Sequence, residues 1–188
     1  MKILFLGYGK DETKLIEFLI NRNHEVTNSS NKIENISGYD LVISFGYRYI
    51  FKDCQLNSLR RPIINLHISY LPFNRGSHPN FWAHYEGTPS GVTIHEIDAG
   101  IDTGPIIFQK KISFNDSKIT LKESYRVLIS EVENLFMQNI SSIEMKNYNE
   151  LKKREEGTYH KKSDLPDWVE WDMPVSYTHL TLPTTDRV

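Results

Sequence analysis

The stretch IINLHISYLPFNRGSHP, residues 63–79, decides both the fold and the site of this chain. The β-branched pair Ile63–Ile64 begins a run typical of a buried strand. This run carries an amide, Asn65, and an imidazole, His67, before Leu71–Pro72 stops it. Polar side chains at the carboxyl end of a strand indicate a ligand site, because open α/β sheets bind their ligands beyond these ends.

Three more strands and one helix are predicted before this strand. The helix has apolar residues at helical spacing and acidic residues at its start, where they suit the helix dipole. Strand, helix and strand with short loops are typical of parallel pairing with right-handed crossovers. We therefore predict an α/β fold with a Rossmann-like open sheet. The strands are expected at Lys2–Leu6, His24–Thr27, Tyr39–Phe45 and Ile63–Leu66, and the helix at Asp11–Asn21.

The second half of the chain has a different pattern. Two strands are predicted, at Gly91–Ile97 and Pro105–Phe114, and a short loop, 98–104, joins them. So short a loop favours an antiparallel pair over another crossover. An amphipathic helix is expected over Leu121–Ile143. The sheet is therefore predicted to be mostly parallel with one antiparallel pair.

Length and composition indicate one domain, which we place at residues 1–174 of the 188. Residues 175–188 continue no period of the preceding sequence, and we predict a non-native or disordered tail without function. A net charge of -2 does not favour nucleic acid, and no apolar run approaches the roughly 20 residues of a membrane span. The single cysteine, Cys54, fits a reducing compartment, so we expect a cytoplasmic protein.

Asn65 and His67, together with a carboxylate from loop 98–104, form a set that suits attack on a carbonyl-type carbon. The amide supplies an oxyanion donor, the imidazole carries a proton, and the carboxylate orients or charges the imidazole. The alternative is structural: Asn65 caps a turn and His67 is a half-buried histidine with satisfied hydrogen bonds.

Two other kinds of site are less favoured. The histidines and carboxylates show no spacing typical of zinc, so no metal is predicted. The turn Gly7–Gly9 lacks the third glycine of a dinucleotide site, and Glu12 would repel a pyrophosphate. The aromatic residues around His78 are expected to be mostly core, with an aromatic wall for a flat heterocycle as the alternative.

Taken together, these residues resemble the folate-dependent formyltransferase family, whose catalytic domain occurs in the glycinamide ribonucleotide and methionyl-tRNA enzymes. The pattern Asn-x-His-x-Ser-x-Leu-Pro, an Arg-Gly turn, Gly-x-Thr-x-His and Asp-x-Gly occurs in that order over roughly residues 1 to 165. It falls at Asn65–Pro72, Arg75–Gly76, Gly91–His95 and Asp102–Gly104. The resemblance implies a formyltransferase fold, N10-formyltetrahydrofolate as co-substrate, no metal, and Asn65, His67 and Asp102 as catalytic residues.

The resemblance also implies where the ligands bind. In the family the pterin lies in an apolar cleft and contacts mostly backbone, which here implies the two segments Phe45, Gly46, Tyr47 and Asp98, Gly100, Asp102. The acceptor side is predicted to include Arg75, Gly76, Trp82, Tyr159 and Lys161, with Trp168 as another candidate for stacking on a nucleobase.

The chain resembles most the branch that formylates dTDP- or UDP-linked deoxyamino sugars for polysaccharide biosynthesis. The acidic turn Lys10–Glu12 argues against the phosphate of glycinamide ribonucleotide, and the slightly acidic chain argues against tRNA. A small nucleotide sugar is thus the expected partner. Transfer to another amine, hydrolysis of formyltetrahydrofolate and a non-catalytic folate-binding module remain alternatives. Members of this branch are often dimers, so a homodimer through residues 121–143 or 159–171 is also open.

Overall fold

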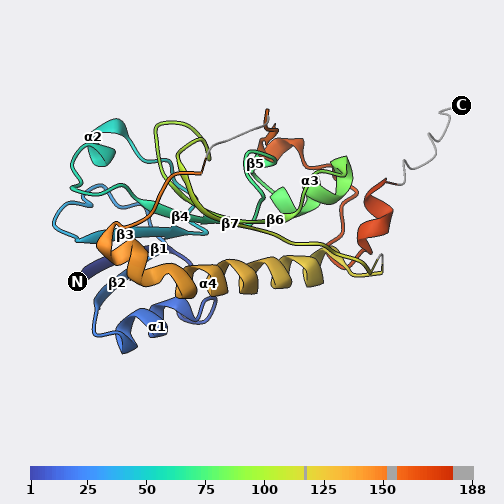
Figure 1. Ribbon diagram of the computed structural model, residues 1–188. Coiled ribbons are helices and arrows are strands. Elements are labelled where there is room, and N and C mark those ends of the chain that lie inside the picture. Colours follow the sequence, from blue (N-terminus) through green and yellow to red (C-terminus); the bar gives the residue numbers. More distant parts are fainter. Residues whose placement is uncertain (117, 152–155, 180–188) are drawn as a thin grey trace, which may run out of the picture.

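A twisted six-stranded sheet runs through the molecule, and the computed structural model describes residues 1–116, 118–151 and 156–179 (Figure 1). The strand order is β2-β1-β3-β4-β6-β7; the first four are parallel, and β6 is antiparallel to both β4 and β7. The predicted fold is therefore confirmed. The strands are β1 (Lys2–Gly7), β2 (Glu25–Ser29), β3 (Leu41–Phe45), β4 (Ile64–His67), β6 (Gly91–Glu96) and β7 (Ile106–Lys111).

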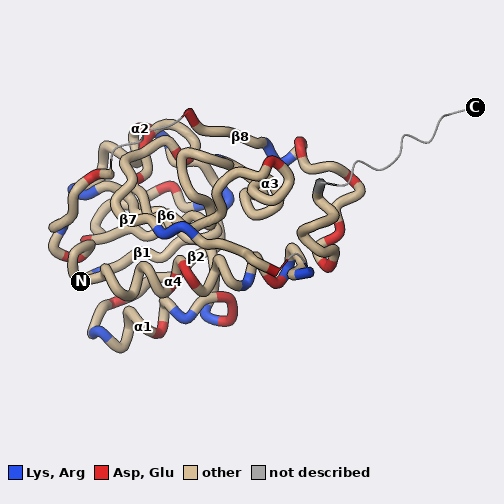
Figure 2. The backbone as a smooth tube through the Cα atoms, turned by 45° about the vertical axis from the view of Figure 1, so that its right-hand side comes forward, with Lys and Arg blue, Asp and Glu red and all other residues tan. Residues whose placement is uncertain are grey.

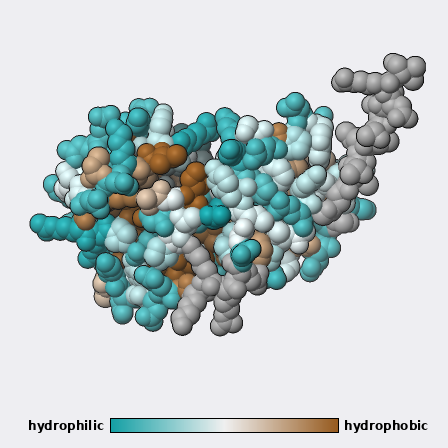
Figure 3. Space-filling view, turned by 90° about the horizontal axis from the view of Figure 1, so that it is seen from above, coloured by the Kyte–Doolittle hydropathy of each residue, from teal (hydrophilic) through white to brown (hydrophobic). Residues whose placement is uncertain are grey.

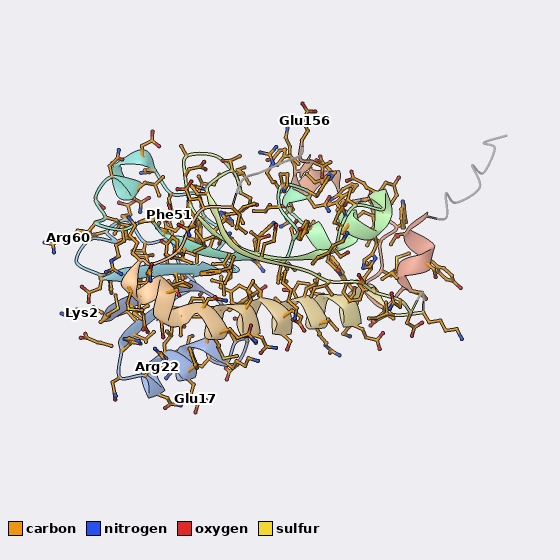
Figure 4. All side chains as sticks on the ribbon, in the orientation of Figure 1. Lys2, Glu17, Arg22, Phe51, Arg60 and Glu156 are labelled. Atoms are coloured by element: carbon orange, nitrogen blue, oxygen red, sulfur yellow. The ribbon has the colours of Figure 1, made fainter. Side chains whose placement is uncertain are left out.

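Helices cover both faces of the sheet. On one face lie α1 (Leu15–Asn21) and the long α4 (Leu121–Met145), and above the other lie the short α2 (Asp53–Leu56) and α3 (Pro79–Glu86) (Figure 1). Residues 3–6 of β1 are fully buried without alternation, as expected for a central strand covered on both faces. Figure 4 shows Phe51 beside α2, on the opposite side of the sheet from Glu17 and Arg22.

The predicted stripe of α4 forms the main core against the sheet. Leu128, Val132, Phe136 and Ile140 are buried there at helical spacing. A capping box begins the helix, because Thr120 accepts a hydrogen bond from the Glu123 N–H and the Glu123 carboxylate accepts one from the Thr120 N–H. No helix of the described part of the chain is long and apolar enough to span a membrane.

A small second sheet was not predicted. It pairs β5 (Arg75–Gly76) with β8 (Tyr159–His160) in parallel, and two short 3₁₀ helices, η1 (Lys162–Asp164) and η2 (Val175–His179), follow β8. A strand of two residues has no side-chain period, so no sequence pattern indicates it.

Several element boundaries differ from prediction. The helix expected from Asp11 begins only at Leu15, because a turn at Gly9 precedes it and the Glu12 carboxylate accepts the Gly9 N–H at 2.9 Å. Strand β7 ends at Lys111, three residues before the expected end.

The tail expected from Val175 lies partly in the described region. Residues 175–179 form η2, and Val175 and Thr178 are buried in contact with the α3 region. The remainder of this tail, residues 180–188, lies outside the described residues.

We expect Phe136→Ala to lower the free energy of unfolding by about 3–5 kcal/mol, because it leaves a cavity in the fully buried interface of α4 with the sheet. Met145→Ala, at the exposed end of the same helix, should change it by less than about 0.5 kcal/mol. Urea unfolding followed by circular dichroism measures both. Equal losses in the two variants would contradict this account of the core.

Candidate active site

A cavity of about 770 Å³ lies along the carboxyl ends of β3 and β4, a size that suits a small-molecule ligand. It is lined by the segments that follow β3, β4, β6 and β8, by the start of α3, and by Tyr125 and Ile129 of α4. Asn65 of β4 reaches it because side chains alternate along a strand, and its neighbours Ile64 and Leu66 pack into the core against α4. Across the sheet Asn65 is in register with Ser44 of β3 and His95 of β6, and both also line the cavity. A polar row therefore crosses one face of the sheet.

The side chains of Asn65 and His95 contact each other directly, with Nδ2 of the amide 2.9 Å from Nε2 of the imidazole. The His95 Nδ1 lies 2.8 Å from the Glu96 carbonyl, so Nδ1 carries the hydrogen and Nε2 accepts from Asn65. The second N–H of the amide makes only a long contact, 3.5 Å to Oδ1 of Asp102. Sequence reasoning gave His95 no role, although it stands in the Gly-x-Thr-x-His motif.

Asp102 reaches this row from the loop between β6 and β7. Because β6 is antiparallel, this loop starts at the amino end of β4, where the Ile97 N–H bonds the Ile63 carbonyl at 2.9 Å, and rises above the sheet (Figure 1). The loop folds back across the face of the sheet, so that Asp102 reaches Asn65 and His67. The Asp98 carboxylate shapes it by accepting hydrogen bonds from Gly100 N–H and the Thr103 hydroxyl.

The Asp102 carboxylate faces both histidines and the amide. Its Oδ2 lies 3.6 Å from Nε2 of His67, and its Oδ1 lies 3.5 Å from Nδ2 of Asn65 and from Nε2 of His95. Burial acts to raise the pKa of Asp102, but His67, His95 and the Gly76 N–H together lower it well below its usual range. Asp102 is therefore an anion at neutral pH.

The imidazole of His67 is neutral at neutral pH. Burial lowers its pKa and so does the nearby His95, while Asp102 and a hydrogen bond to the Asn74 backbone act in the opposite direction. Its Nε2 is buried and has no hydrogen-bond partner among the described residues. A neutral imidazole with an open nitrogen next to a carboxylate can accept a proton and then gain the carboxylate as its ionic partner.

The β5–β8 ribbon holds this arrangement in place. The Gly76 N–H donates to Oδ2 of Asp102 at 2.8 Å, and β8 fixes the backbone on either side of Gly76 through Arg75 N–H to the Thr158 carbonyl and Ser77 N–H to the His160 carbonyl. Gly76 has a φ of +89°, and a Cβ there would lie 2.3 Å from the His160 carbonyl oxygen. Only glycine fits at this position.

The residues expected to contact the pterin all lie on the cavity. Phe45, Gly46 and Tyr47 lead from β3 into it, and Asp98, Gly100 and Asp102 approach from the loop after β6. The Tyr8 ring packs so closely over Gly46 that a Cβ there would lie 2.6 Å from it. The two segments that the sequence places far apart therefore meet on one cavity.

Only some of the residues expected to bind the acceptor line the cavity. Gly76, Tyr159 and Lys161 line the cavity, whereas Arg75 and Trp82 do not. Trp82 is buried and stacks on the His160 ring at 3.9 Å with an angle of 8°. Trp168 also lies away from the cavity, edge-on to Phe81. Further residues that the sequence analysis did not assign to a ligand line the cavity, among them Arg48, His78, Lys162 and Trp171.

The described residues contain no group of three or more histidine, cysteine and carboxylate side chains arranged to hold a metal ion. His67, His95 and Asp102 instead contact one another and Asn65 through hydrogen bonds and charge.

Comparison with known proteins agrees with this geometry. Residues 10–140 match the formyl transferase family. A dTDP-4-amino-4,6-dideoxyglucose formyltransferase of Mycobacterium tuberculosis is 31% identical over 132 residues, which are 70% of this chain and 55% of the relative. The same figures hold for its counterpart in Mycobacterium bovis. The chain thus spans about half the length of the curated relatives it matches.

Solved structures extend the likeness. The formyltransferase PseJ of Anoxybacillus kamchatkensis, in complex with UDP-4,6-dideoxy-4-formamido-L-AltNAc and tetrahydrofolate, superposes with a TM-score of 0.86. It is 37% identical, and the match covers 95% of this chain and 98% of that one. A 4-N formyltransferase of Francisella tularensis gives a TM-score of 0.74 at 25% identity, covering 87% and 77% of the two chains.

We expect the His67 imidazole to titrate below the ordinary histidine value of about 6.5, because burial disfavours its charged form. Asp102→Asn should lower this pKa further, since it removes the carboxylate that favours the imidazolium. An NMR pH titration of the histidine side chains, assigned with His67→Asn, measures both. A midpoint above 6.5 in the unmodified protein would refute a neutral His67.

Gly76→Ala should lower the free energy of unfolding by at least about 1 kcal/mol more than Gly38→Ala. Both glycines have a positive φ, but a Cβ at Gly38 meets nothing within 4 Å, so only Gly76→Ala adds a clash with β8. Urea unfolding compares the pair. Equal losses of unfolding free energy in the two variants would mean that the β5–β8 ribbon accommodates the added Cβ without strain and does not fix Asp102.

Proposed function

The chain belongs to the formyl transferase family, and from that premise we propose that it transfers a formyl group from N10-formyltetrahydrofolate to an amino group of a nucleotide-linked deoxyamino sugar. The names of its relatives support this proposal. The mycobacterial relatives are formyltransferases of a dTDP-linked 4-amino sugar, and PseJ was solved with a UDP-linked 4-formamido sugar and tetrahydrofolate.

One observation carries the proposal. Asp102 lies 3.5 Å from the Asn65 amide and 3.6 Å from the His67 imidazole, and all three residues line a cavity of about 770 Å³. An amide donor, a neutral imidazole and an anionic carboxylate are what acyl transfer to an amine requires. The buried setting strengthens each of these interactions.

The chemistry follows from these three side chains. The acceptor amine attacks the formyl carbon, and the negative charge that develops on the formyl oxygen is held by the N–H of Asn65 that does not bond His95, in place of its 3.5 Å contact with Asp102. The amine proton passes to His67, and the anionic Asp102 stabilises the imidazolium. His67 then returns this proton to the folate nitrogen as the carbon–nitrogen bond to the donor breaks. Tetrahydrofolate and the formamide are the products.

We assign the pterin to the end of the cavity formed by Phe45, Gly46 and Tyr47, with Asp98 and Gly100 on the facing loop. Apolar side chains surround this end of the cavity, and both segments line it. Gly76, Tyr159 and Lys161 are proposed for the acceptor. The exposed single cysteine fits a cytoplasmic enzyme. A homodimer stays a prediction.

The test is release of tetrahydrofolate from N10-formyltetrahydrofolate, followed by absorbance against a panel of acceptors. The panel holds dTDP- and UDP-linked 3-amino and 4-amino deoxysugars, glycinamide ribonucleotide, methionyl-tRNA and a control without acceptor. Turnover with a nucleotide sugar alone supports the proposal. Release without acceptor would identify a hydrolase, and folate binding without turnover would identify a binding module.

Asn65→Ala should lower kcat by about a hundred- to a thousandfold, because it removes the donor to the oxyanion. The Kd for tetrahydrofolate, measured by fluorescence quenching, should stay within about threefold, since no pterin contact is assigned to Asn65. Asn139→Ala, on α4 outside the cavity, is the control and should retain full activity. An unchanged kcat in Asn65→Ala would remove Asn65 from the chemistry.

A further inference from the structure

The cavity has two chemically different halves. One half lies along the segment after β3 and carries the apolar residues Tyr47, Tyr49, Ile50 and Phe51. The other half lies between α3 and the segment after β8. Seen from above, hydrophobic surface gathers over the half of the molecule that carries α2, and the half that carries α3 is mostly hydrophilic (Figure 3). We therefore expect an apolar ligand to bind in the first half of the cavity and a charged ligand in the second.

The catalytic carboxylate joins the two halves. Asp102 follows Ile101, which lines the cavity, and bonds the Gly76 N–H, beyond which Ser77 and His78 continue along the other half. With the pterin in the apolar half, the acceptor must approach Asn65 from the α3 side.

Basic groups converge in the α3 half. Lys161 and Lys162 directly follow β8 as a basic stretch, visible in Figure 2, and both line the cavity together with His78. Burial lowers the pKa of His78, and the positive charge of Lys162, which lines the same cavity, lowers it further. The nearby Asp164 carboxylate is engaged by the backbone N–H of Lys161 at 2.7 Å.

In the part of the chain that the structure describes, the ammonium groups of Lys161 and Lys162 have no anionic partner. Among the residues that the structure describes, neither Lys161 nor Lys162 forms an ion pair, although Lys14, Lys110 and Lys122 each do. Like charges that converge on a cavity without a counter-ion repel one another, and an anionic ligand relieves this repulsion.

An aromatic platform stands next to the basic groups. Trp171 lines the cavity with its ring 5.7 Å from that of His78, and 43% of the residue is exposed. Its backbone is nevertheless fixed, because its carbonyl accepts the Lys122 N–H at 2.8 Å at the start of α4. A fixed, exposed indole is a stacking surface that loses little entropy on binding. Trp82, which the sequence suggested for this role, is unavailable because it is covered by His160.

We propose that this corner, formed by His78, Lys161, Lys162 and Trp171, binds the nucleoside diphosphate half of the acceptor. The diphosphate lies against the two ammonium groups and His78, the base stacks on Trp171, and the amino sugar extends toward Asn65. This inference rests on the proposed function, and it adds the residues that hold the nucleotide. Arg48, the other cation on the cavity, lies on the apolar segment and is left to the folate side.

The test uses the full chain and binding alone. Isothermal titration with UDP and dTDP should give a Kd that rises about tenfold in Lys162→Ala and about a hundredfold in the double variant with Lys161→Ala. The Kd should also rise with ionic strength. Trp171→Ala should weaken UDP about tenfold. Uridine, which lacks phosphate, should respond to Trp171→Ala and not to the lysine variants.

Two matched controls separate the corner from general surface effects. Lys111 is on β7 and Trp168 packs against Phe81, and neither residue lines the cavity. The variants Lys111→Ala and Trp168→Ala should therefore bind UDP as the unmodified protein does. Tetrahydrofolate binding should be unchanged in all of these variants. Circular dichroism checks that each variant is folded.

The outcomes separate the inference from the function on which it rests. If nucleotide sugars turn over but UDP binding is absent or unaffected by the corner variants, the corner is wrong and the proposed function stands. If neither UDP nor dTDP binds and no nucleotide sugar turns over, both fail.

Discussion

The antiparallel entry of β6 beside β4 is the constraint on which the site depends. It puts His95 in register with Asn65, so that one imidazole fixes the orientation of the amide. It also starts the following loop at the amino end of β4, which forces Asp102 to return across the sheet. A parallel strand in the place of β6 would end beside the carboxyl end of β4, and the following loop would start at that edge of the sheet instead. The reversal therefore brings an amide, two imidazoles and a carboxylate onto one face.

Much of this fold follows from local sequence. Unbroken apolar runs predict the central strands, and the helical stripe predicts α4, because burial on the faces of a sheet demands these patterns. Asn65 and His67 stand out because polar residues interrupt such a run. Asp102 could be placed only through the motif resemblance, since its approach depends on the path of a loop.

Other features have no local signal. Strands β5 and β8 each contain two residues and owe their existence to each other across more than eighty positions. Trp82 and Trp171 are the same residue type, yet one is buried beneath His160 and the other is exposed on the cavity. Tertiary packing decides which aromatic side chain is available, and sequence alone does not distinguish the two.

The pairing of β5 with β8 has a consequence for how the chain matures during synthesis. The six strands of the sheet and α4 lie within the first 145 residues, so the core can assemble from this portion as it leaves the ribosome. The backbone that holds the Gly76 N–H against Asp102 is completed only by Thr158 and His160. The core of a nascent chain can therefore fold before its active site is complete, and the site forms only late in translation.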